Sequence, residues 1–164
     1  MPLPLSPSAQ RFQNLINDLG HPVHVVEFSA STRTAAEAAA VVGCEVAQIA
    51  KSIMFRTRDS GRPVLVVASG SNRVNETAVA RRLGPLIGGE KLAKADAEFV
   101  RANAGYAIGG VPPLGHTVPP VVLVDRDLLA FDTVWAAAGT PSAVFPVAPA
   151  TLVALTGGQV DEVT

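Results

Sequence analysis

The sequence contains few of the residues that support disulfide-linked or highly charged proteins. It holds one cysteine, Cys44, which precludes an internal disulfide and fits a reducing compartment, so we expect a cytoplasmic protein. Charged residues make up only 16% of the chain, and the net charge is −1. This balance argues against a protein that coats long nucleic acid, but it permits contact with a short nucleic-acid end.

Long apolar runs are absent as well. Glycine, proline or charge interrupts every apolar run before the roughly 18 residues that a membrane-spanning helix needs. The N-terminus, MPLPLSPSAQRF, has no basic segment followed by a long apolar one, so we expect neither a secretory signal nor a membrane partner. The 164 residues, 48% of them hydrophobic, favour one domain over residues 1–164 with a genuine core.

Hydrophobic spacing and turn residues predict a single compact mixed α/β domain, with an N-terminal helix at about 8–20 and a core at about 22–157. We expect helices at 8–20, 35–42, 75–83, 94–105 and 148–156, and strands at 22–28, 50–57, 62–70, 121–125, 143–148 and 159–163. Glycine and proline fill residues 106–120, which predicts an irregular loop. Because the strands do not alternate strictly with helices, a doubly wound parallel sheet is disfavoured.

Several motifs that carry familiar chemistry are missing. The chain has no G-x-x-x-x-G-K-[ST] loop, no G-x-G-x-x-G after a strand and no exposed G-x-S-x-G elbow. His21 and His24 are three residues apart, but they flank a proline and no carboxylate cluster is near them in sequence. We therefore expect no metal and no cofactor.

Lys51 opens the apolar strand predicted at 50–57. It shares a face with Ile53 and Phe55, whereas Ser52 and Met54 point the other way. Either the lysine stem runs along apolar surface and the ammonium reaches water, or the cation is held at a pocket. The strand alone favours the first interpretation.

The second unusual feature is the loop GGVPPLGH, Gly109–His116. Two glycines allow the backbone to approach a ligand closely, and Pro112 and Pro113 then make the chain stiff. Such a loop can hold N–H and C=O groups in the fixed directions needed to orient a water or stabilise an oxyanion. It can equally be a tight loop that leads into the next strand, and His116 can either touch a substrate or fold back on the loop.

Together, the segments AAEAAAVVGCEVAQIAKSIMF, PVLVVASGSNRVN and EFVRANAGYAIGGVPPLGH resemble the YbaK/prolyl-tRNA-synthetase-associated family over about residues 22–157. Lys51 fills the place of the family's hallmark lysine, and Gly109–Pro113 matches its G-x-x-x-P loop. The resemblance implies a curved, barrel-like mixed sheet with surrounding helices. It also implies a free-standing aminoacyl-tRNA deacylase, which cleaves the ester between a wrong amino acid and the 3′ end of a tRNA without a metal or a covalent nucleophile.

We hypothesise that Lys51, Gly109 and Gly110 are catalytic. An ammonium at a partly dry pocket rim is a strong partner for the terminal adenosine phosphate or the ester region, and backbone groups around Gly109–Pro113 can orient the attacking water. The candidate substrate contacts are Thr32, Thr34, Ser52, Ser69, Asn72, Val111, Pro112, Pro113 and His116. For Ser69 and Asn72, local turn capping is an equal alternative. We also expect Gly110→Val to abolish turnover without unfolding the protein. The implied partner is the acceptor 3′ end of mischarged tRNA, with an aminoacyl-tRNA synthetase as a further candidate and the protein as a monomer or homodimer.

The amino acid removed is predicted only as a class. In the resembled family the segment before the alanine-rich helix lines the amino-acid pocket, and some relatives carry a bulkier aromatic at or near Thr34. Small polar groups there fit alanine, serine or threonine better than a cysteine-specific assignment, although a small pocket discriminates weakly among such side chains. The alternative function is a non-catalytic module of the same fold that binds a tRNA end, a nucleotide or a synthetase.

Overall fold

A computed structural model describes residues 4–164. The helices are α1 Pro7–Asp18, α2 Ala35–Val42, α3 Glu76–Leu83, α4 Ala97–Ala104 and α5 Pro149–Thr156. The strands are β1 Val26–Glu27, β2 Ile49–Thr57, β3 Pro63–Ser69, β4 Leu92–Lys94, β5 Val121–Asp125, β6 Val134–Ala137, β7 Ala143–Val147 and β8 Gln159–Asp161. Three short 3₁₀ helices, η1 Val46–Gln48, η2 Gly84–Ile87 and η3 Arg126–Ala130, complete the order.

The strands form one mixed eight-stranded sheet in the order β1-β7-β6-β2-β3-β5-β8, with β4 paired to β2 outside this path. Pairs β2–β6, β3–β5 and β5–β8 are parallel, and the other pairs are antiparallel. The mixed α/β prediction is therefore confirmed. None of the helices in residues 4–164 has the length and hydropathy needed to cross a membrane.

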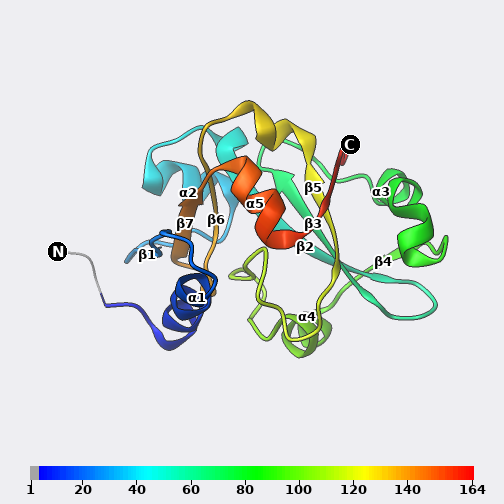
Figure 1. Ribbon diagram of the computed structural model, residues 1–164, viewed down its shortest axis with the longest axis horizontal. Coiled ribbons are helices and arrows are strands. Elements are labelled where there is room, and N and C mark those ends of the chain that lie inside the picture. Colours follow the sequence, from blue (N-terminus) through cyan, green and yellow to red (C-terminus); the bar gives the residue numbers. More distant parts are fainter. Residues whose placement is uncertain (1–3) are drawn as a thin grey trace.

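The β2–β3 hairpin separates two apolar cores, because β3 is buried on both faces. Leu65 and Val67 pack in the core beneath α1, whereas Val64 and Val66 pack in a second core beneath α3. Figure 1 shows α1 and α3 toward opposite ends of the molecule, with the hairpin running between them. The alternation of side chains along one strand thus serves both cores.

The sequence placed most elements, and the differences have local causes. The helix expected from residue 94 begins only at Ala97, because Lys94 pairs with Phe55 in β4 and the Asp96 side chain caps the helix. Strand β6 was not predicted, since its alanines have weak β propensity and the strand forms through its pairing with β2 and β7. The strand expected at 22–28 is reduced to Val26–Glu27.

Helix α1 packs on the sheet through Ala9, Phe12 and Ile16, which are fully buried, and the Phe12 ring centroid lies 5.0 Å from that of Phe145. We expect Phe12→Ala to lower the free energy of unfolding by about 3–5 kcal/mol, because it leaves a cavity in a close-packed core. Chemical denaturation measures this change. Leu19→Ala is the control, since Leu19 is 48% exposed at the end of the same helix; equal losses in both variants would contradict this account of α1.

Candidate active site

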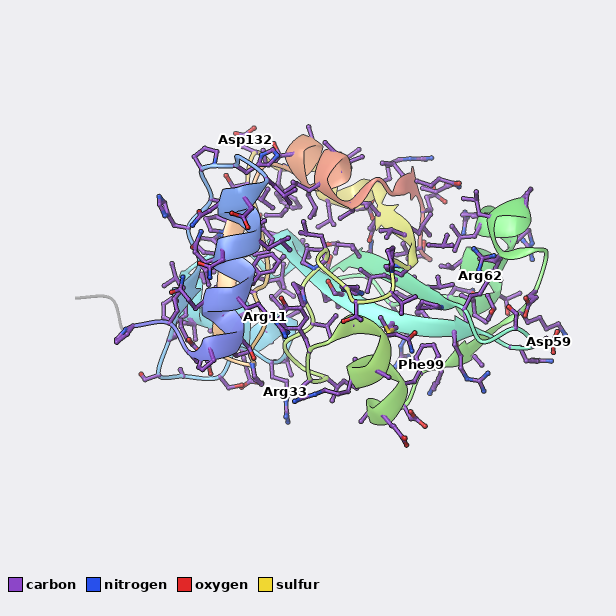
Figure 2. All side chains as sticks on the ribbon, turned by 60° about the horizontal axis from the view of Figure 1, so that its bottom comes forward. Arg11, Arg33, Asp59, Arg62, Phe99 and Asp132 are labelled. Carbon is purple, nitrogen blue, oxygen red and sulfur yellow. The ribbon has the colours of Figure 1, made fainter. Side chains whose placement is uncertain are left out.

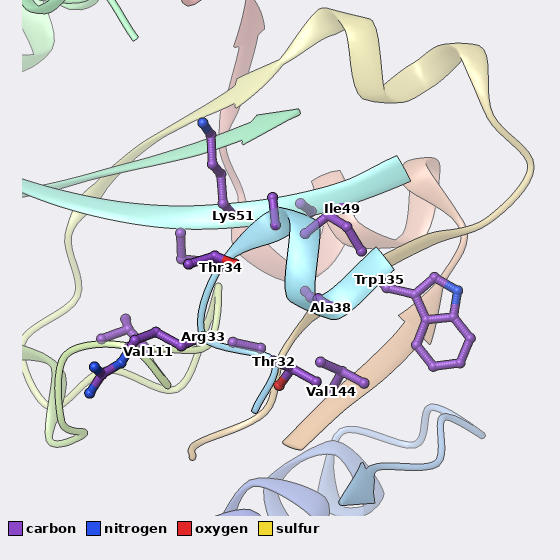
Figure 3. A pocket seen from close by; sticks show the side chains of 15 residues that line it. Thr32, Arg33, Thr34, Ala38, Ile49, Lys51, Val111, Trp135 and Val144 are labelled. Carbon is purple, nitrogen blue, oxygen red and sulfur yellow. The ribbon is translucent and has the colours of Figure 1, made fainter. Parts of the chain in front are cut away.

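Two cavities that share part of their lining lie beside β2. The inner pocket has a volume of about 80 Å³, and the groove outside it has about 930 Å³. The residues that line both cavities form what we call the junction: Arg33, Thr34, Ala35, Lys51, Ser52, Gly109 and Val111. The rest of the inner pocket is lined by Thr32, Ala38, Ile49, Ala50, Trp135, Ala136, Ala137 and Val144 (Figure 3).

An interruption in the sheet provides the space for these cavities. Strand β3 pairs with β2 from Ala50 to Arg56. On the other side of β2, the pairing with β6 ends at Ala50 and the pairing with β4 begins only at Phe55. Residues 51–54 therefore have a strand on one side only, and we call this segment the β2 gap. The predicted lysine and the serine after it both lie in the gap.

Lys51 is half-buried at the junction, which supports the second of its two interpretations. As predicted, it shares a face with Ile53 and Phe55, and both of these residues line the groove and pack in the core under α3. Figure 3 shows the lysine side chain extending from β2 away from Val111. The ammonium therefore faces the groove, on the side of β2 opposite to the glycine-proline loop.

The loop approaches the junction through Gly109 and Val111. Gly110 is buried behind them: its carbonyl accepts a hydrogen bond from the N–H of Gly139 at 2.9 Å. A Cβ at Gly110 would lie 2.5–2.7 Å from backbone atoms of Thr140. The expectation that Gly110→Val leaves the fold intact is therefore wrong, because any larger side chain must displace this backbone contact.

Arg33 is a junction residue that the sequence does not predict. Its side chain lies along Gly109, where an added Cβ would be 3.1 Å from the guanidinium Nε. Figure 2 shows the guanidinium reaching solvent on the side of α4 and Phe99. An exposed arginine without a motif gives no sequence signal, so only the folded position of residues 29–34 shows that it borders both cavities.

Ser69 and Asn72 hold neighbouring backbone in place. The Ser69 hydroxyl donates to the carbonyl of Ala47 at 2.7 Å, and the residue is buried away from both cavities. Asn72 lines the groove, but its amide donates to Asp125 at 2.9 Å and to Asp127 at 2.7 Å. These hydrogen bonds join segments 22 to 55 positions apart in the sequence, so they are not local turn caps, and of the two residues only Asn72 borders the groove.

His116 folds back on the loop. Its Nε2–H donates to the carbonyl of Pro112 at 2.7 Å, while Nδ1 is buried and has no hydrogen-bond partner in residues 4–164. Pro112 and Pro113 are buried too, and none of these three residues lines either cavity. Burial lowers the pKa of His116, and the hydrogen bond to Pro112 opposes that shift in part.

The hydroxyls around the inner pocket differ in what they bind. The Thr32 hydroxyl donates to the carbonyl of Pro141 at 3.1 Å. The Thr34 hydroxyl accepts from the N–H of Glu37 and donates to the Glu37 carboxylate, so it caps the start of α2. Ser52 Oγ is buried and has no partner among residues 4–164. Of these three hydroxyls, only that of Ser52 remains available.

The charged residues that line the groove are mostly cations. Four basic residues line it, Arg33, Lys51, Arg73 and Lys94, against one carboxylate, Glu76. Of the basic residues concentrated between Arg56 and Lys94, only Arg73 and Lys94 converge here, and Arg82 instead pairs with Asp161 and Glu162. Within residues 4–164, no cluster of three His, Cys, Asp or Glu side chains has the arrangement of a metal site.

A family model for the aminoacyl-tRNA editing domain matches residues 29–155, the part of the chain that contains both cavities. The chain belongs to the aminoacyl-tRNA editing domain family. This editing-domain protein is also similar to a crystal structure described as a proposed trans-editing enzyme for prolyl-tRNA synthetase. The two are 46% identical with a TM-score of 0.89, over 98% of this chain and 99% of that chain.

Two curated relatives extend the comparison. The uncharacterized protein YwhH of Bacillus subtilis is 30% identical over 125 residues, which are 76% of each chain. The proline–tRNA ligase of Limosilactobacillus fermentum is 36% identical over 98 residues, 58% of this chain but only 16% of the ligase. The family predicted from Lys51 and the G-x-x-x-P loop is thus confirmed.

The half-buried His116 is expected to make the stability of the fold depend on pH. Because its pKa is lowered in the folded protein, the unfolded chain binds its proton more readily as the pH falls below about 6.5, the ordinary histidine value. The contribution of His116 to the free energy of unfolding is complete above that pH and is lost progressively as the pH falls below it. His116→Gln keeps a donor for Pro112 but cannot titrate, so its unfolding midpoint should fall less between pH 7 and pH 5 than that of the parent protein; parallel curves would contradict this prediction.

Proposed function

We propose that this editing-domain protein is an aminoacyl-tRNA deacylase that hydrolyses the ester of mischarged tRNA. The observation that supports this most directly is the arrangement of the cavities: a small pocket shares the junction residues with a wide groove whose charged residues are mostly cations. An aminoacyl end fits this arrangement, with its side chain in the pocket, its ester at the junction and its nucleotides in the groove.

The inner pocket suits a small side chain. Three of its walls are alanines, Ala38, Ala136 and Ala137, and its volume of about 80 Å³ has room for a few non-hydrogen atoms. Alanine, serine, threonine and cysteine all remain candidates, because a pocket of this kind separates near-isosteric side chains by only about 1–3 kcal/mol.

In this proposal Lys51 and the other groove cations bind phosphates of the tRNA 3′ end. A half-buried ammonium interacts more strongly with an anion than an exposed one, since less water screens the pair. The direction of the Lys51 side chain, away from Val111, favours the phosphate over the ester carbonyl as its partner (Figure 3). The main chain around Gly109 and Val111, which lies on the other side of the junction, is the proposed site for orienting the attacking water.

The substrate tRNA follows from the relatives only as a further proposal. One similar structure is described with prolyl-tRNA synthetase as the enzyme it serves, and one similar chain is a segment of a proline–tRNA ligase. Proline tRNA charged with a smaller amino acid is therefore the first substrate to test. The alternative, a non-catalytic module, would use the same groove to bind a tRNA end without hydrolysis.

The decisive experiment incubates the protein with a panel of correctly and incorrectly charged tRNAs and records which of them lose their amino acid. Loss from a mischarged tRNA together with stability of the correctly charged one supports the deacylase. Measurable tRNA binding without hydrolysis across the panel supports the binding module instead.

Lys51→Ala should lower kcat/KM for the hydrolysed tRNA about ten- to a hundredfold, as expected when a charged hydrogen bond that contributes about 1.5–3 kcal/mol is lost. Lys91→Ala is a matched control, because Lys91 is exposed and does not line the groove. If Lys51→Ala hydrolyses every mischarged tRNA at the parent rate, the lysine has no part in the reaction.

A further inference from the structure

Ser52 has both a main-chain N–H and a side-chain O–H at the junction. In a strand, successive residues point their N–H and C=O groups to opposite neighbours. The carbonyl of Ile49 accepts from Gly70 at the end of β3, and the N–H of Thr57 donates to Arg62 just before β3. The main-chain N–H and C=O groups of odd-numbered β2 residues thus point toward β3. Those of Ser52 point to the opposite side, where the β2 gap leaves no paired strand.

The Ser52 side chain faces the loop rather than the lysine. It alternates with Lys51 and lies on the same side of β2 as Ala50 and Met54, whose core also contains Val111. Its Oγ is buried without a partner, whereas Thr32 and Thr34 at the same pocket have theirs. Ser52 therefore presents an uncommitted O–H and an unpaired main-chain N–H at the junction, close to the proposed position of the ester.

The charge around the junction decides what these two donors can bind. Its charged residues, Arg33 and Lys51, are both cations, and none of the inner-pocket residues carries a carboxylate. Such surroundings favour a group that gains negative charge, as the carbonyl oxygen of an ester does during hydrolysis. A buried hydroxyl without a partner is also unfavourable for the fold, so its presence here is better explained by a bound group than by packing.

We propose that Ser52 is a catalytic residue whose O–H and main-chain N–H donate hydrogen bonds to the oxyanion formed during ester hydrolysis. This inference rests on the proposed deacylase function and assigns a new role within it. The water oxygen attacks the ester carbon, and the electron pair of the C=O bond moves to the oxygen that faces Ser52. The tetrahedral intermediate then collapses and the bond to the ribose oxygen breaks. The proton from water ends on that ribose oxygen, while Ser52 keeps its own proton.

The test compares Ser52→Thr with Ser52→Val, two side chains of nearly the same shape of which only threonine keeps a hydroxyl. The substrate is alanine-charged proline tRNA or whichever mischarged tRNA the panel shows to be hydrolysed fastest. We expect kcat to be about a hundredfold lower in the valine variant than in the threonine variant, with little change in KM, because the donor acts on the transition state. Ser52→Ala provides a second comparison without added bulk.

Stability gives an independent readout, since removal of an unpartnered buried hydroxyl should not weaken the fold. The thermal unfolding midpoint of Ser52→Ala should equal or exceed that of the parent protein, although its kcat is reduced. A lower midpoint that accounts for the lost activity would show that the hydroxyl is structural and would overturn the proposal.

The two proposals fail in different ways. If the parent protein hydrolyses a mischarged tRNA and the valine and threonine variants have equal kcat, the role of Ser52 is wrong and the deacylase function stands. If the parent protein hydrolyses no tRNA in the panel, both proposals are overturned.

Discussion

The pairing of β2 is the constraint on which the rest of the site depends. One neighbour, β3, pairs with it almost throughout, while β6 and β4 pair only with its two ends. The continuous ladder keeps the strand extended and fixes which side chains point to each core. The interruption on the other side creates space for a ligand within the sheet, so the rigidity and the opening come from the same strand.

Other parts of the molecule support this opening from a distance. Arg11 on α1 donates to the carbonyl of Gly105 at 2.5 Å, and its guanidinium lies 4.1 Å from the centre of the Tyr106 ring. Figure 2 shows Arg11 extending from α1 toward the loop that follows α4. The Gly110 backbone rests on Thr140, whose hydroxyl donates to Glu27 at 2.9 Å. The glycine-proline loop is thus held from both sides, and such support keeps main-chain groups in fixed directions.

Much of this could be predicted from the sequence, because it depends on local patterns. The alternation of side chains along a strand predicts that Lys51 shares a face with Ile53 and Phe55. The spacing of Thr34 to Glu37 is typical of a helix N-cap, and the glycines and prolines of residues 106–120 predict an irregular loop. The features that could not be predicted depend on contacts between segments far apart in the sequence. Strand β6 exists because β2 and β7 pair with it, Arg33 reaches the site because its segment lies over Gly109, and the isolation of the Ser52 hydroxyl depends on where two other strands stop.

The double role of Thr34 has a consequence for how this site can change. The residue lines the inner pocket, and its hydroxyl is also the N-cap of α2. A larger side chain introduced there to alter the choice of amino acid would remove the cap, at a cost of about 1 kcal/mol to the helix. The wall of α2 that faces the pocket, Ala35 and Ala38, would then be less firmly placed. Under the proposed function, one residue thus affects both the choice of amino acid and the stability of α2, so a substitution that changes the first also changes the second.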